Sequence, residues 1–235
     1  MAKRYLGIIV TYIVAQLSIL PVAIISSKME LNPSTHNNLV MGWQITSFVL
    51  ALLITLVLLR KEKTLPKDPD RASPTMTVVW SILGFFMALA GQSIARMIQT
   101  ELLGIQEQSQ NTVEIMEITR SFPIFIIVVA VIGPILEEII FRKIIFGQLY
   151  KETNFIIAGT ISGLIFAVIH NDFTHLLVYF VMSFVFAFIY VKTKRVIVPI
   201  LAHVSMNTFV IIIQLFFAEH IIEEINQVQA ILIGG

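Results

Sequence analysis

Long apolar runs alternate with short polar segments along this chain, and the pattern predicts an all-α membrane protein. Most of the runs reach the length of about 20 residues that an α-helix needs to cross the hydrocarbon core of a bilayer. The segments between them carry the prolines and charges that are typical of exposed connections. We expect one polytopic transmembrane helical bundle of about seven spans, at residues 5–25, 39–59, 76–103, 122–149, 155–170, 173–191 and 196–217.

The composition supports the same class of protein. Of the 235 residues, 57% are hydrophobic and 13% are charged, and the mean hydropathy is +0.86, which places the chain among polytopic membrane proteins with lipid around them. The basic residues form no stripe, so nucleic acid is not expected as a partner. The chain has no cysteine, which excludes disulfides, thiolate nucleophiles and cysteine-bound metals.

Loop charges indicate an orientation. If seven spans alternate, Lys3 and Arg4 fall on the same side as the basic groups within 60–71, 142–151 and 192–195. The positive-inside rule makes this side cytoplasmic, so we expect the N-terminus in the cytoplasm and the C-terminus outside. The compact size favours a bacterial plasma membrane, and the tail 219–235 has no assigned role.

The fourth apolar run contains charges that hydrophobicity alone would forbid. Glu137, Glu138 and Arg142 lie within it, and an ionisable group at bilayer depth costs several kcal/mol or more unless it is paired or hydrated. On a helix, Glu138 and Arg142 share a face and can neutralise each other. Glu137 lies about 100° away from Glu138 and must find a partner elsewhere in the bundle.

Two other apolar runs carry polar groups. His170 ends the fifth run, and His203 and Asn207 lie one turn apart on one face of the seventh. Taken singly, each could be a hydrogen-bonding group that tightens helix packing. Taken together with Glu137, they provide the groups needed to activate water and to stabilise an oxyanion.

These residues resemble the signature of a known family. The motifs Glu137-Glu138-x-x-x-Arg142, Phe166-x-x-x-His170 and His203-x-x-x-Asn207 are similar to those of the CAAX protease and bacteriocin-processing family. This family of intramembrane endopeptidases includes the type II CAAX prenyl endopeptidase. The resemblance covers a catalytic core at 122–217 within a single membrane domain, and residues 1–103 form three accessory spans without a matching motif.

The resemblance implies a role for each residue. Glu137 would be the general base on a water molecule, and His170 would hold and polarise that water. His203 and Asn207 would donate hydrogen bonds to the oxyanion, while Glu138 and Arg142 would support the site. The substrate would be a membrane-associated peptide or protein, such as a signal peptide, a pheromone, a bacteriocin precursor or a prenylated tail.

Other functions use the same residues. Glu137, His170 and His203 could hold Zn²⁺ as a His₂Glu site with an open position for water. We favour a metal-free mechanism with no cofactor, because a His-Glu-x-x-His pairing is absent and Asn207 is a poor zinc ligand. A non-catalytic scaffold or immunity protein is the other alternative, and the retained signature favours an enzyme. A transporter is disfavoured because no internal repeat is evident.

The mechanism depends on the convergence of three helices. Upright ideal helices would leave His170 nearer the outer side than Glu137, so we expect a tilted fifth helix, or a fourth helix bent at Gly133-Pro134, around a water-filled cavity. Asp172 and His175 are expected to be solvated at the membrane edge, although His175 could flank the cavity. Arg96 is expected to pair with a loop glutamate or to extend to the interface.

Overall fold

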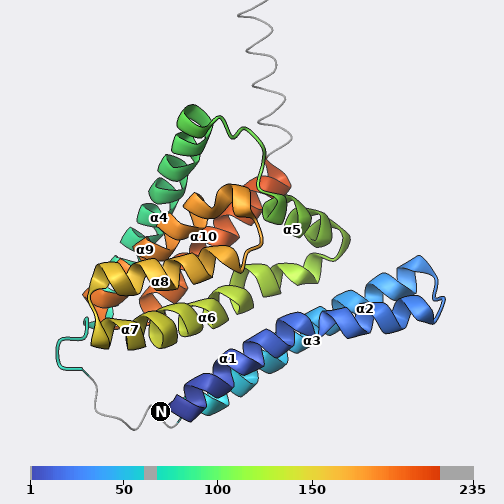
Figure 1. The fold of residues 1–235 in the computed structure, drawn as a ribbon, viewed down its shortest axis with the longest axis horizontal. Coiled ribbons are helices and arrows are strands. Elements are labelled where there is room, and N and C mark those ends of the chain that lie inside the picture. The colour runs from blue at the N-terminus through green and yellow to red at the C-terminus, as the bar shows by residue number, and fades with distance from the viewer. Residues whose placement is uncertain (1, 61–67, 218–235) are drawn as a thin grey trace, which may run out of the picture.

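The computed structural model describes residues 2–60 and 68–217, which are almost entirely helical (Figure 1). The longer elements are α1 (Ala2–Leu17), α2 (Ile19–Lys28), α3 (Pro33–Leu59), α4 (Pro74–Leu103), α5 (Gln110–Ser121), α6 (Gly133–Glu138), α7 (Gly147–Glu152), α8 (Phe155–Val168), α9 (Leu176–Thr193) and α10 (Ile197–Phe216). Six helical stretches of the described residues are long and apolar enough to cross a membrane, and α8 is a shorter apolar helix. The predicted all-α membrane bundle is confirmed.

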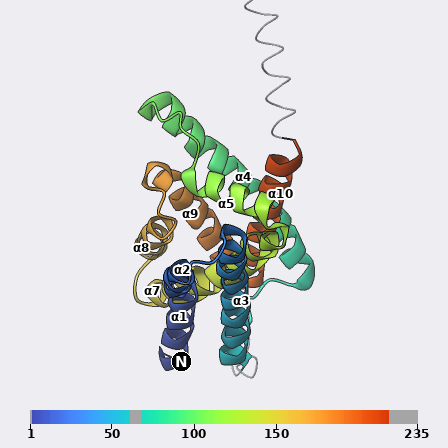
Figure 2. The ribbon, with the colours of Figure 1, turned by 90° about the vertical axis from the view of Figure 1, so that its right-hand side faces the viewer.

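The first two spans form a helical hairpin. This hairpin lies along the fourth span, Pro123–Glu152, which contains α6 (Figures 1 and 2). The first span is interrupted between α1 and α2 at Ser18. Pro21 explains the break, because it has no N–H to donate to the carbonyl of Leu17, four residues earlier. Asn32 accepts a hydrogen bond from the Thr35 N–H at the start of α3, with Pro33 in the first turn, a favourable helix start.

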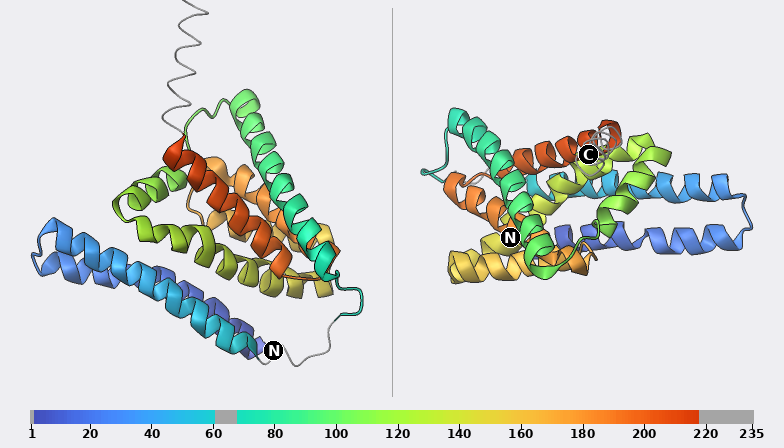
Figure 3. Two further views of the ribbon diagram at one scale, coloured as in Figure 1. Left: turned by 180° about the vertical axis from the view of Figure 1, so that it is seen from behind. Right: turned by 90° about the horizontal axis from the view of Figure 1, so that it is seen from above.

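The remaining helices form the body of the bundle. Helix α10 lies between α4 and the stretch containing α6 (Figure 3). Gly159 and Gly163 of α8 face α9, where an added Cβ atom would lie 3.1 Å from the rings of Phe184 and Phe180. The absence of side chains at these two positions therefore lets α8 and α9 approach closely.

The fourth span, Pro123–Glu152, is not a regular α-helix. The 3₁₀ turn η2 (Pro123–Phe125) is followed by the π-helical segments η3 (Val128–Ile132) and η4 (Ile139–Phe146) on either side of α6. In η3 the N–H of Gly133 donates to the carbonyl of Val128, and Pro134 has no N–H to continue the pattern. At Gly133-Pro134, where the sequence predicted a bend, the structure shows a change of helical winding, and π segments are frequent at functional sites.

Connections at the two ends of the bundle have different characters. The polar segment after α4 contains α5, whose first turn is capped by Ser109 accepting from the Thr112 N–H. At the other end, the Ala72 N–H donates to the Thr193 carbonyl at 3.0 Å, so the connections before α4 and after α9 meet. Residues 61–67 of the basic connection and the tail 219–235 lie outside the described residues.

Candidate active site

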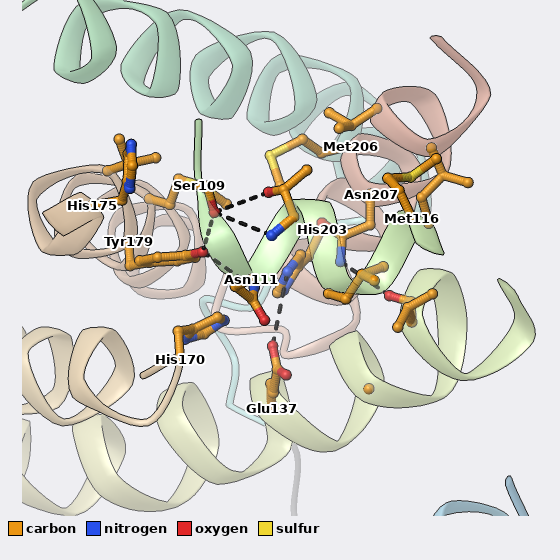
Figure 4. Close-up of a pocket in the computed structure, with 18 of the residues that line it drawn as sticks. Ser109, Asn111, Met116, Glu137, His170, His175, Tyr179, His203, Met206 and Asn207 are labelled. Atoms are coloured by element: carbon orange, nitrogen blue, oxygen red, sulfur yellow. Dashed lines mark hydrogen bonds and ion pairs between the residues drawn. The ribbon is translucent and has the colours of Figure 1, made fainter. Parts of the chain in front are cut away.

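The helices bring the predicted polar residues together at one cavity. Glu137, His170, His203 and Asn207 all line a cavity of about 580 Å³ (Figure 4). They come from α6, from the turn after α8 and from α10, so the expected convergence is present. A cavity of this size is within the range of binding sites for small molecules and peptide segments.

Glu138 and Arg142 lie behind the cavity wall and are fully buried. The Arg142 Nε atom is 3.0 Å from Glu138 Oε2, in the ion pair expected from their spacing. The Arg142 guanidinium also lies over the rings of Phe166 and Phe186, at 4.7 and 5.4 Å from the ring centroids. Charge pairing and cation–π contacts offset part of the cost of removing this cation from water.

Glu138 also orients His203. The His203 Nδ1 atom lies 2.9 Å from Glu138 Oε1, and because a carboxylate only accepts, Nδ1 carries the hydrogen. The other ring nitrogen, Nε2, points to Glu137 Oε2 at 3.9 Å. The His203 ring is stacked on Phe186 with the centroids 4.7 Å apart. His203 is therefore fixed on one side and directed into the cavity on the other.

His170 is held by the backbone and by an aromatic ring. Its Nδ1 atom donates to the Phe166 carbonyl at 2.7 Å, and its ring is stacked on Tyr179 with the centroids 4.1 Å apart. In Figure 4 the His170 side chain lies between Tyr179 and Glu137. With a hydrogen on Nδ1, the neutral ring has a lone pair on Nε2 that can accept a hydrogen bond.

The length of α8 explains how His170 reaches the site. Its 14 residues rise about 21 Å at about 1.5 Å per residue, less than the hydrocarbon thickness of about 30 Å. The sequence run 155–170 suggested a span that ends near the outer side. The helix ends at Val168, and His170 lies in the turn that follows, on the cavity wall.

Asn207 occupies a place created by the irregular fourth span. Its Nδ2 atom donates to the Val129 carbonyl at 3.1 Å. In the π pattern this carbonyl would accept from residue 134, which is a proline without an N–H. Asn207 thus satisfies the Val129 carbonyl with one of its two amide hydrogens and keeps the second.

The first hairpin contributes a residue that sequence reasoning missed. Tyr12 of α1 is 6% exposed, lines the cavity and makes a polar contact with the Glu137 carboxylate and with Gln16. Gln44 of α3 lines the same cavity. A tyrosine in an apolar span is normally interpreted as a packing residue, so no sequence signal distinguished Tyr12.

The expectation that Asp172 and His175 are solvated is wrong, and the alternative that His175 flanks the cavity is confirmed. Their exposed fractions are 5% and 3%, and His175 Nδ1 lies 2.9 Å from Asp172 Oδ1. Burial raises the pKa of Asp172, but hydrogen bonds from Ser109 and His175 outweigh it and hold the pKa below its ordinary value. Arg96 bonds His175 and the loop carbonyls of Gln106 and Glu107.

The arrangement of the acidic and imidazole side chains bears on whether the site could hold a metal ion. Among the described residues, no three histidine, aspartate or glutamate side chains come together in an arrangement that could hold a metal ion. His203 and Glu137 approach each other, but His170 does not complete a set with them. The side chains of this structure therefore do not fit a His₂Glu zinc centre, which needs three protein ligands.

Comparison with known proteins adds independent information. Residues 119–209, which include all six predicted site residues, match the family described as type II CAAX prenyl endopeptidase, Rce1-like. The chain is 43% identical to "Putative membrane peptidase YdiL" of Bacillus subtilis (strain 168), over 100% of this chain and 99% of that protein. It is 40% identical to "Membrane-embedded CAAX protease MroQ" of Staphylococcus aureus (strain USA300), over 73% of this chain and 72% of that protein. No solved structure matches.

Proposed function

The chain belongs to the Rce1-like family of membrane CAAX proteases and is a membrane peptidase, and we propose that it cleaves membrane-associated peptides with water activated by Glu137. One observation carries the proposal: His203, fixed by Glu138, directs Nε2 toward the Glu137 carboxylate at 3.9 Å, on the wall of a large cavity. A carboxylate and an imidazole at this separation can act on the same water and peptide bond.

Glu137 is the general base of the proposed reaction. Its carboxylate takes one proton from a water molecule while the water oxygen forms a bond to the carbonyl carbon of the scissile peptide. The Nε2 lone pair of His170 accepts the second hydrogen of the water and so orients the attacking oxygen. When the C–N bond breaks, Glu137 passes its proton to the leaving amine nitrogen.

His203 and Asn207 stabilise the oxyanion of the tetrahedral intermediate. His203 contributes Nε2–H when both ring nitrogens carry hydrogen, and Asn207 contributes the Nδ2 hydrogen that Val129 does not use. Each donor is held from behind, by Glu138 and by the Val129 carbonyl respectively. Donors fixed before the reaction stabilise the transition state without reorganising during it.

The proposed mechanism is metal-free, and metal analysis tests it. The membrane-purified protein should show no stoichiometric zinc by elemental analysis, and its cleavage activity should survive treatment with a chelator. Stoichiometric zinc that is removed together with the activity would overturn the metal-free proposal in favour of the zinc alternative.

The substrate is proposed to be a peptide or protein of a bacterial plasma membrane, such as a signal peptide, a pheromone, a bacteriocin precursor or a prenylated tail. Polar cavity residues, including Gln108 and Gln214, lie at the α5 end of the bundle, opposite Thr193. With the N-terminus in the cytoplasm and the C-terminus outside, this end faces outward. Accessibility of tags at the two termini tests the orientation.

The decisive experiment compares peptides in cells that produce the wild-type protein or Glu137→Gln at equal membrane levels. Mass spectrometry should find fragments that accumulate only with the wild type, and their precursors should accumulate with Glu137→Gln. Glu114→Gln, which changes an exposed carboxylate on α5, is the matched control and should resemble the wild type. Identical peptide sets in all three strains would contradict the proposed function.

A further inference from the structure

A chain of hydrogen bonds runs along the α5 end of the cavity, from Arg96 of α4 to Tyr179 of α9. Arg96 Nη1 lies 2.7 Å from His175 Nε2, and His175 Nδ1 lies 2.9 Å from Asp172 Oδ1. Ser109 Oγ donates to Asp172 Oδ2 at 2.6 Å and lies 3.3 Å from the Tyr179 hydroxyl. These residues connect two helices, the α5 cap and the turn after α8.

The chemistry of the partners assigns a direction to each bond between Arg96 and Tyr179. Arg96 only donates, so His175 accepts at Nε2 and donates from Nδ1 to Asp172. Ser109 gives its single hydrogen to the carboxylate, so the Tyr179 hydroxyl must donate to Ser109. Asn111 Nδ2 donates in turn to the Tyr179 oxygen at 3.2 Å (Figure 4). The Glu107 carbonyl also lies 3.2 Å from His175 Nε2, but with Nε2 as an acceptor this carbonyl accepts only from Arg96 Nη2.

The end of this chain touches the proposed site. The Tyr179 ring is stacked on the His170 ring with an interplanar angle of 24°. The Phe166 carbonyl fixes Nδ1 and the Phe166 ring lies 4.7 Å from the His170 ring between centroids, and the Tyr179 stack is the third contact that holds the ring. A ring whose hydroxyl is bonded by two neighbours has little freedom to rotate or shift.

The turn that carries Asp172 is anchored to α4. Asn171 takes a left-handed conformation with φ of 53°, which asparagine tolerates better than most residues. The Thr174 carbonyl accepts from Gln99 Nε2 at 2.7 Å, and Gln99 is 1% exposed. Irregular backbone beside a membrane requires internal partners of this kind, and Gln99 supplies one.

We propose that Tyr179, anchored through Ser109 and Asp172 to His175 and Arg96, is a positioning residue that sets the orientation of His170 for catalysis. The inference rests on the proposed function, because it assigns the network to the same reaction. The proposal gives a role in the cleavage rate to polar groups that lie outside the family motifs, among them Ser109, Asp172 and His175.

A double-mutant cycle tests whether the chain acts through Tyr179. Asp172→Asn and Tyr179→Phe should each lower the formation of Glu137-dependent peptides about 10-fold per folded protein, within the roughly 100-fold that a displacement of about 1 Å can cost. The double variant should be no more than about 2-fold slower than Tyr179→Phe alone, because residues of one network are not additive. Losses that multiply to about 100-fold, or no loss in either single variant, would overturn the proposal.

Matched variants separate positioning from general damage. Ser109→Thr keeps the hydroxyl and should retain most of the rate that Ser109→Ala loses. Tyr150→Phe removes a phenol hydroxyl on α7, outside the cavity, and should leave the rate unchanged. If Ser109→Thr loses as much as Ser109→Ala, hydrogen bonding by Ser109 is not the cause and the proposal fails.

A spectroscopic arm does not depend on activity. The chain has five histidines, so labelled histidine gives few NMR signals in detergent micelles. The His170 ring resonances should shift in Tyr179→Leu, which removes the stacked ring, and in Asp172→Asn, but not in Tyr150→Phe. Unchanged His170 resonances in Asp172→Asn would overturn the positioning role. If no Glu137-dependent peptide exists, the proposed function fails, and these shifts alone decide whether the network holds His170.

Discussion

Two clusters in this molecule contain the same three groups, a carboxylate, an imidazole and a guanidinium, in different order. In the first cluster the carboxylate is central: Glu138 contacts Arg142 at 3.0 Å on one oxygen and His203 at 2.9 Å on the other. His203 therefore uses only Nδ1 for the cluster. Its Nε2 atom is left to face Glu137 and the cavity.

In the second cluster the imidazole is central. His175 contacts Asp172 through Nδ1 and Arg96 through Nε2, so both ring nitrogens are engaged in holding the turn. The comparison teaches that the position of the imidazole in such a cluster decides its use. An imidazole at the end has a nitrogen available for chemistry, whereas one in the middle is a connector.

The largest expected effect tests this difference directly. His203→Gln removes an oxyanion donor and should lower the cleavage rate about 100- to 1,000-fold. His175→Gln should lower it only about 10-fold, because it acts through position. Both rates are measured as Glu137-dependent peptide formed per folded protein. Equal losses in the two variants would break the distinction between the clusters.

The two carboxylates should also differ in their contribution to stability. Glu138→Gln leaves the buried Arg142 charge without a counterion and should lower the free energy of unfolding by about 3–5 kcal/mol. Asp172→Asn should cost less, because Arg96 keeps the Gln106 and Glu107 carbonyls as partners. Reversible denaturation in mixed micelles measures both values.

A compensating variant is the control for this stability prediction. Combining Glu138→Gln with Arg142→Met removes the unpaired charge and should recover part of the lost free energy. If the double variant is as unstable as Glu138→Gln alone, the loss comes from disrupted packing and not from the orphaned guanidinium.

A smaller effect on the cleavage rate is expected at Tyr12. This residue contacts Glu137, which belongs to neither cluster. Tyr12→Phe keeps the edge-to-face ring contact with Phe48 but removes the hydroxyl beside Glu137. We expect the rate to fall a few-fold, on the scale of about 1 kcal/mol for a single hydrogen bond, with unfolding unchanged. A change in stability with no change in rate would make Tyr12 a packing residue only.

The fold could be predicted from sequence because its signal is strong and local. Runs of about 20 apolar residues have few alternatives to membrane helices, and the spacing of Glu138 and Arg142 gives their ion pair without any tertiary information. The winding of the fourth span was not predictable in the same way. Its π segments depend on which carbonyls Asn207 and other neighbours can satisfy.

The site was predicted only where its residues repeat a motif. His203 and His175 are both single histidines in apolar surroundings, and the sequence does not show which ring nitrogens will be occupied. That depends on Arg96, 79 positions away from His175. Tyr12 was missed for the same reason, because its contact with Glu137 exists only after the first hairpin packs against α6.

The pH dependence of stability should distinguish the second cluster. The pKa of Asp172 lies below its ordinary value of 3.8 in the folded chain. A group of this kind stabilises the fold above its unfolded-state pKa, and the contribution is lost as the pH falls through the lower folded-state pKa. Between pH 7 and pH 3, wild type should therefore lose more stability than Asp172→Asn, as measured by unfolding at each pH. Parallel curves would contradict this assignment.

The smallest effect is expected for an ion pair that is exposed to solvent. Lys194 contacts Asp68 at 3.1 Å and Asp70 at 3.0 Å, and the Asp70 N–H and Lys194 lower the pKa of Asp68. Lys194→Met should nevertheless leave the unfolding midpoint unchanged at high salt, because exposed pairs are screened and hold mobile side chains. Lys28→Met, at the exposed end of α2, is the matched control. A loss of stability comparable to that of Glu138→Gln would mean that charge pairing, and not burial, makes the first cluster, around Glu138, indispensable.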